Sequence, residues 1–249
     1  MTVLVGGVYE LFQGDLDLGR LAVERLRAEG LPDVLAEDLH YGAVAVVQRL
    51  QDLRPQALVL VTAVRRDRPP GTVERRRVHP FAVDPADFQA AVGDAVTGYV
   101  HVDLLVEVAS GFDALPARTV AIEVEPARVG PGEGLTPLAT AALEDALAMV
   151  HAEVRRMPLL QLADELAGLV EGDRLTSSPA LDALRALLDE LDGLDRNGSW
   201  GHAFALRDRM RLAIASASSS EGMDHRDWGL WWALIEELDR IEALEAVAG

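Results

Sequence analysis

The chain has 249 residues, of which 49% are hydrophobic and 26% charged, and its formal net charge is −18. This length suits two modest domains, the composition suits a soluble globular protein, and no apolar run approaches the about 18 to 20 residues that span a bilayer. The negative charge disfavours nucleic acid as a partner, and the absence of cysteine excludes disulfides and thiolate metal ligands. No positively charged leader opens the chain, so we expect a cytoplasmic protein with no membrane partner.

Strand and helix patterns alternate through the first 156 residues. Short apolar runs, typical of buried strands, are separated by segments with helical spacing of apolar residues. Strand patterns lie at 3–5, 33–38, 57–61, after the Pro69-Pro70-Gly71 turn and at 119–125, and helix patterns lie at 18–29, 43–53, 100–110 and 137–156. We therefore predict, for residues 1–156, an α/β fold: a three-layer sandwich with a twisted, mostly parallel sheet and helices on both faces.

Residues 157–249 carry helical patterns only. Apolar residues recur there in three stripes: Leu159, Leu162, Leu166 and Leu169; Leu181, Leu184, Leu187, Leu188 and Leu191; and Phe204, Leu206, Met210 and Ile214. We expect connecting loops at 173–179 and 191–201, a serine-rich break at 216–222 and a last helix over 228–247. The sequence thus predicts an all-α helical bundle extension.

Three tryptophans, Trp228, Trp231 and Trp232, lie close together in that last helix. Such a cluster can anchor the helix in its own bundle, which is the default, or present a binding hot spot to a partner. The segment 65–77 is the one concentrated basic segment and holds six arginines. Two interpretations stay open for it, a solvated hairpin or a docking patch for an acidic partner.

The loop after the first strand carries a recognisable motif. It reads Gly7-Val8-Tyr9-Glu10-Leu11-Phe12-Gln13-Gly14-Asp15-Leu16-Asp17-Leu18-Gly19. This resembles the opening G-x-G-N-x-L-x-x-D-E/D-x-x-G of the NiFe-hydrogenase maturation protease family, with Gly7, Asp15 and Gly19 in register. The second glycine and the asparagine of that motif are Tyr9 and Glu10 here.

Four further elements follow in the family's order. A turn ends at Gly42, an apolar strand over 58–64 leads to Pro70-Gly71-Thr72, His101 opens a helical pattern, and a glycine-rich loop precedes Thr136-Pro137. The resemblance spans about residues 3–154. It implies the same three-layer fold and an ancestral activity as an endopeptidase that removes the C-terminal extension of a hydrogenase large subunit.

The resemblance also identifies three positions that hold the family's metal ligands. They correspond to Leu16, Thr62 and His101, so two ligands that are acidic in the family are leucine and threonine here. In the family, nickel in the large subunit identifies the substrate and orients its cleavage. One imidazole cannot hold a divalent ion firmly against water, so we predict that nickel-guided cleavage is absent or severely weakened.

A rebuilt site is the alternative, because Asp15 and Asp17 flank the lost ligand, with Glu10 on the same loop and His40 on the next one. With His101 they could hold nickel or zinc, or they could be solvated loop carboxylates. His101 could equally be a helix-start or core histidine. Thr62 as a nucleophile is disfavoured, since no base can be placed beside it.

Two functions therefore follow from the sequence. The first is a non-catalytic or altered homologue that binds a protein partner through the old substrate cleft, the helical extension, or both. The second is a working metal-guided endopeptidase that processes the C-terminus of a hydrogenase large subunit or another protein. A remote third is a small-molecule enzyme that uses the carboxyl ends of the strands.

Overall fold

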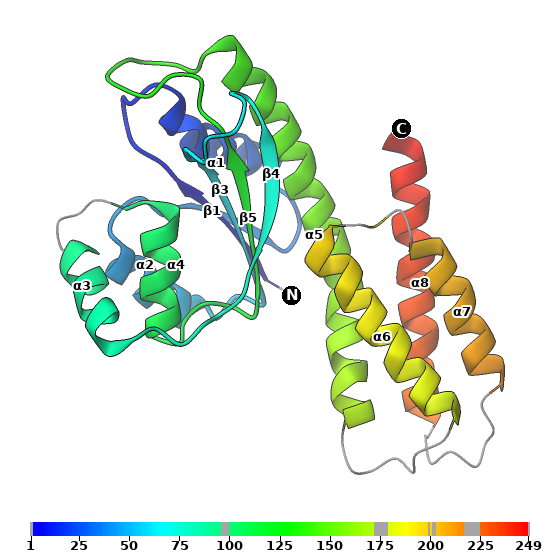
Figure 1. The fold of residues 1–249 in the computed structure, drawn as a ribbon. Helices are drawn as coiled ribbons and strands as arrows, with labels where there is room; N and C mark the ends of the chain where they lie inside the picture. The colour runs from blue at the N-terminus through cyan, green and yellow to red at the C-terminus, as the bar shows by residue number, and fades with distance from the viewer. Residues whose placement is uncertain are drawn as a thin grey trace. The chain divides into compact units, whose positions relative to one another are not determined.

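The computed structural model describes residues 2–95, 100–171, 179–198, 200, 203–216 and 225–248. The chain forms two compact units, Met1–Val154 and Arg155–Gly249 (Figure 1). The sequence prediction put this boundary after residue 156. Within the described residues, no helix is long and apolar enough to cross a membrane.

The first unit is built on a five-stranded sheet. Its strands are β1 (Val3–Val8), β2 (Val34–Asp38), β3 (Ala57–Ala63), β4 (Val73–Val78) and β5 (Arg118–Val124). The order is β2-β1-β3-β5-β4, in which β4 alone runs antiparallel to its neighbour. All residues of β1 and β3 are buried, as expected of central strands covered on both faces. The predicted α/β fold with a mostly parallel sheet is confirmed.

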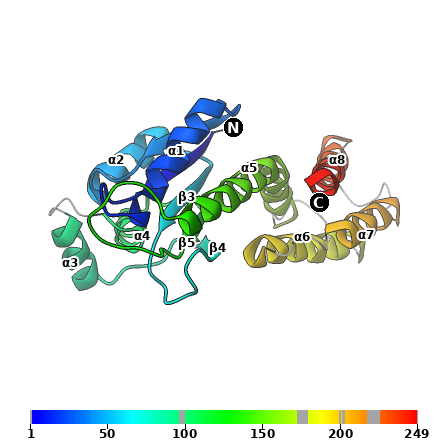
Figure 2. The same cartoon turned by 90° about the horizontal axis from the view of Figure 1, so that it is seen from above.

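Helices cover both faces of this sheet. The helices α2 (Ala43–Leu53), α3 (Pro85–Ala95) and α4 (Val102–Gly111) lie together beside the sheet (Figure 1) and share one apolar core with it. The helix α1 (Leu18–Glu29) and the first half of α5 (Pro137–Glu171) cover the other face (Figure 2). An ion pair between Arg25 and Glu144 joins α1 to α5, and His151 lies 2.6 Å from Glu29. A short 3-10 helix, η1 (Asp15–Asp17), precedes α1.

The second unit consists of helices, as predicted. It holds the rest of α5, then α6 (Pro179–Asn197), α7 (Ala203–Ser216) and α8 (His225–Ala248). Each contributes buried residues to the core of the unit, among them Leu159, Leu184, Leu206 and Trp231. Most members of the predicted stripes whose side chains the structure describes are buried: Leu159, Leu166, Leu184, Leu187, Leu188, Leu191, Leu206, Met210 and Ile214.

The larger differences from the prediction concern the ends of two helices and one helix that was not predicted. The helix α5 does not end at residue 156 but continues through Pro158 to Glu171, because Met157, Leu159 and Leu160 are buried around the proline. Residues 191–197 are helical and not a loop, since buried Leu191 and Leu194 continue the stripe of α6. The helix α3 was not predicted at all. Most of the loops predicted at 173–179 and 216–222 lies outside the described residues.

Candidate functional site

A cavity of about 230 Å³ lies where β1 and β3 end and α4 begins. Its wall is built from four segments: the exit of β1 through Leu16, the exit of β3, the start of α4, and Val129. The lining residues are Val8, Tyr9, Glu10, Leu16, Thr62, Ala63, Val64, Arg65, Val100, His101, Val102 and Val129. Carboxyl ends of parallel strands are where open α/β sheets bind ligands.

The cavity brings together the three positions to which the motif resemblance assigns metal ligands. Leu16, Thr62 and His101 all line it, although they are far apart in the sequence. Strand pairing explains part of this, because Val8 and Thr62 are register partners at the ends of β1 and β3. His101 reaches the same place as the N-cap residue of α4.

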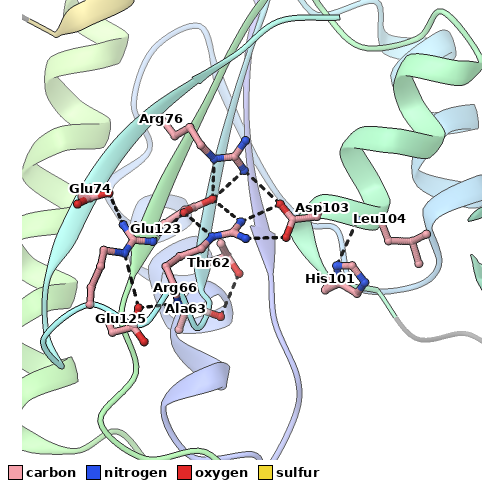
Figure 3. A network of polar contacts seen from close by, with 11 residues as sticks. Thr62, Ala63, Arg66, Glu74, Arg76, His101, Asp103, Leu104, Glu123 and Glu125 are labelled. Carbon is pink, nitrogen blue, oxygen red and sulfur yellow. Dashed lines mark hydrogen bonds and ion pairs between the residues drawn. The ribbon is translucent and has the colours of Figure 1, made fainter. Parts of the chain in front are cut away.

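These three side chains do not fit a nickel or zinc ion. Leu16 offers no donor atom, and the hydroxyl of buried Thr62 lies 3.4 Å from the carbonyl oxygen of Ala63. The Nδ1 atom of His101 accepts a hydrogen bond of 3.2 Å from the backbone N–H of Leu104, as Figure 3 shows. Within the described residues, no group of three or more His, Asp or Glu side chains could hold a metal ion. Threonine is a poor ligand for such ions, and one imidazole is too few.

Asp15 and Asp17 do not line this cavity and have other bonding partners. Asp15 is fully buried and accepts hydrogen bonds from the backbone N–H groups of Ala127, Arg128 and Thr136, and from the Thr136 hydroxyl. Asp17 is buried and forms an ion pair of 2.5 Å with Arg20. The interpretation of both as solvated carboxylates is therefore wrong, because the loop before α5 folds back over η1. A metal site rebuilt from them stays a prediction that would require these bonds to break.

Tyr9 stands at a position where the resembled motif has a glycine. Its ring is 7% exposed, lines the cavity and stacks on His40 with a centroid distance of 4.3 Å. Its hydroxyl donates a hydrogen bond of 3.0 Å to Asp38. Burial first, and then this bond, raise the pKa of Tyr9. The sequence analysis did not predict the stacking of Tyr9 on His40, and the one feature that pointed to it was a tyrosine at a glycine position of the motif.

Five of the six arginines in the basic segment 65–77 are bonded to groups of their own chain. Arg66, Arg68 and Arg76 surround the carboxylate of Glu123, which is 2% exposed, at distances of 2.7 to 2.9 Å (Figure 3). Arg66 also donates two hydrogen bonds to Asp103, of 2.9 and 2.7 Å. We call these five residues the arginine cluster.

Burial by itself would raise the pKa of Glu123, but the hydrogen bonds from Arg66 and Arg76 outweigh burial and lower this pKa to about 2. Two more arginines of the segment are also engaged. Arg75 pairs with buried Glu153 at 2.7 Å, and Arg77 donates to the carbonyls of Thr119 and Ala117. The segment is therefore not a solvated hairpin, and its use as a docking patch for an acidic partner stays a prediction.

The three tryptophans of α8 have different surroundings. Trp231 is fully buried in the helical unit, Trp228 is half-buried, and Trp232 is 48% exposed. Core packing thus accounts for Trp231. Partner binding through Trp228 and Trp232 stays a prediction.

Similarity to known proteins lies with solved structures, since no protein-family model and no curated protein matches the chain significantly. Hydrogenase maturating endopeptidase HybD from E. coli is 24% identical over 63% of this chain and 94% of that chain, with a TM-score of 0.46. An endopeptidase from Escherichia coli is 28% identical over 63% of this chain and 94% of that chain, with a TM-score of 0.47. A hydrogenase 2 maturation peptidase from Thaumarchaeota archaeon SCGC_AB-539-E09 is 24% identical over 60% of this chain and 96% of that chain, with a TM-score of 0.45.

Proposed function

We propose that this chain is a hydrogenase maturation protease-like protein that binds a polypeptide segment of a partner in its cavity and does not perform nickel-guided cleavage. The observation that carries the proposal is the meeting of Leu16, Thr62 and His101 in one cavity. The motif resemblance assigns metal ligands to these three positions, and two of the three side chains here cannot bind a metal firmly.

The lining of the cavity supports binding of an apolar group. Five of its twelve lining residues are valines, and Leu16 adds a hydrocarbon surface at a position where the family has an acid. Burial of apolar ligand surface is the main source of affinity in such sites. Binding of a partner's apolar side chain in this cavity would therefore be favourable, whereas binding of a metal ion would not.

The loop beside the cavity presents further apolar surface. Leu11 is 45% exposed and Phe12 is 62% exposed, directly after the lining residues Tyr9 and Glu10. Phe12 has a φ of 60°, which bulky residues rarely adopt, and its carbonyl accepts a hydrogen bond from Gly132. A strained backbone that holds an aromatic ring in solvent supports a recognition role for this loop.

Restoring the missing ligands tests the proposal. The double variant Leu16→Glu, Thr62→Asp would complete a set of two carboxylates and one imidazole with His101. We expect calorimetric titration of nickel or zinc into the chelator-treated protein to show no binding up to millimolar metal for the parent chain. The double variant should bind with micromolar affinity, and adding His101→Ala should abolish that binding.

The matched control is Leu16→Gln, Thr62→Asn, which has similar side-chain volumes but no carboxylates and should not bind metal. Tight metal binding by the parent chain, lost in His101→Ala, would instead favour the metal-guided endopeptidase. A second measurement addresses cleavage: the parent chain should leave the C-terminal tail of a nickel-loaded hydrogenase large-subunit precursor intact, as followed by mass spectrometry.

A further inference from the structure

Arg65 differs from the other arginines of the α/β unit. In the described part of that unit, every other arginine has a hydrogen bond, an ion pair or another electrostatic contact within the chain, whereas Arg65 has none. Arg65 is exposed, and it lines the cavity next to Val64. In a chain with a net charge of −18, a cation without a partner beside an apolar cavity indicates an anionic ligand group.

The size of the cavity limits what that ligand can be. An engineered cavity of about 150 Å³ holds one benzene ring, and drug-sized ligands occupy about 300 Å³ or more. The cavity here measures about 230 Å³ and lies between these values. It therefore suits one large apolar side chain together with a small group attached to it.

We propose that the cavity binds the C-terminal residue of a partner polypeptide, with the apolar last side chain inside and the terminal carboxylate paired to Arg65. This inference rests on the proposed function and specifies its ligand. A guanidinium binds a carboxylate through two parallel hydrogen bonds, which fixes the orientation of the chain end.

The second charged group of the wall favours a polypeptide over a simple carboxylic acid. Glu10 lines the cavity after β1, whereas Arg65 lines it after β3. A carboxylate has room for several hydrogen bonds, so Glu10 can accept one from the backbone N–H of the last residue. A fatty acid has no such N–H. Exposed Leu11 and Phe12 lie next to Glu10 in the sequence and offer apolar contact to the residues before the chain end.

Fluorescence polarisation with the full-length protein tests this inference. The probes are pools of short fluorescein-labelled peptides, randomised except for a C-terminal leucine or phenylalanine, with either a free carboxylate or a C-terminal amide. The free-acid pools should bind about tenfold more tightly than the amide pools, as expected for one charge-assisted pair. Arg65→Gln should reduce free-acid binding to the amide level, and Arg65→Lys should keep part of the preference.

Arg25→Gln is the matched control, because it removes the same charge from an exposed arginine of α1 and should keep the preference. Equal binding of the free-acid and amide pools would overturn this inference while leaving the proposed function supported. Displacement of the peptides by equimolar octanoate would overturn it in favour of a small carboxylic acid. Failure of both pools to bind would also overturn it, and the metal-restoration experiment would still decide the proposed function.

Discussion

Gly7 and Gly19 show why single positions of the opening motif allow only one residue type. A Cβ atom on Gly7 would lie 2.4 Å from the carbonyl oxygen of Gly19, and one on Gly19 would lie 2.7 Å from the carbonyl oxygens of Val61 and Val8. These neighbours are backbone atoms, which cannot turn away as a side chain can. The close approach lets α1 sit directly on β1 and β3 and thereby positions Leu16 at the cavity.

We expect Gly19→Ala to lower the free energy of unfolding by about 3 kcal/mol, because the new methyl group overpacks two strand backbones. Urea denaturation followed by circular dichroism measures this value. Gly93→Ala is the matched control, since nothing lies within 4 Å of its Cβ position in α3, and it should stabilise the protein by about 0.5 to 1 kcal/mol. Equal effects of the two substitutions would show that α1 does not pack this closely.

The arginine cluster acts at the scale of elements, because it joins segments that build different walls of the cavity. Arg66 follows the lining residues at the exit of β3, and Asp103 follows those at the start of α4. The guanidinium of Arg66 pairs with Glu123 on β5 and also binds Asp103. The backbone N–H of Arg66 donates a hydrogen bond to Glu125. The cluster therefore fixes the distance between the β3 wall and the α4 wall.

The lowered pKa of Glu123 predicts how stability depends on pH. The folded state favours the charged carboxylate, so its contribution is fully present above the ordinary value of 4.5 and is lost as pH falls toward about 2. A shift of this size corresponds to on the order of 3 kcal/mol for a buried group. The urea concentration at the unfolding midpoint should decrease as the pH is lowered from 4.5 to about 2. In Glu123→Gln this midpoint should depend less on pH. Glu144→Gln, at an exposed ion pair, should leave the decline unchanged.

Elements with strong local patterns were predictable, and elements held by distant contacts were not. The bounds of α1 and α2 agree with the prediction to the residue, because apolar spacing and a following glycine or proline mark them. The helix α3 has only Ala91 and Ala95 buried, so it carries no apolar stripe to read. The helix α5 passes Pro158 because packing on both sides of it outweighs the lost hydrogen bond.

The same distinction holds for the site. Motif order was enough to predict that Leu16, Thr62 and His101 occupy related positions, and the cavity brings them together. The hydrogen-bond partners of Asp15 and Glu123 could not be predicted, since they are distant in the sequence. Arg128 is 113 residues from Asp15, and Arg76 is 47 residues from Glu123. Long-range pairing of charges leaves no periodic signal in the sequence.

At the scale of the whole molecule, the two compact units each have their own buried core. In the first unit Leu58 of β3 is 1% exposed, and in the second Leu184 of α6 is fully buried. Pro158 stands just after the boundary at Val154 and cannot donate the helical hydrogen bond to the carbonyl of that residue. The helix α5, which continues from one unit into the other, is therefore weakened where the units divide.

We expect the units to unfold as separate cooperative transitions. Leu58→Ala and Leu184→Ala should each cost about 2 to 5 kcal/mol, because each leaves a cavity in a packed core. In differential scanning calorimetry of the full chain, Leu58→Ala should lower the melting temperature of one transition and Leu184→Ala that of the other. Amide hydrogen exchange should assign the transitions, with faster exchange confined to the strands in the first variant and to α6, α7 and α8 in the second. If both variants shifted one common transition, the helical unit would be an integral part of the α/β fold, and its contribution to partner binding could not be separated from that of the cavity.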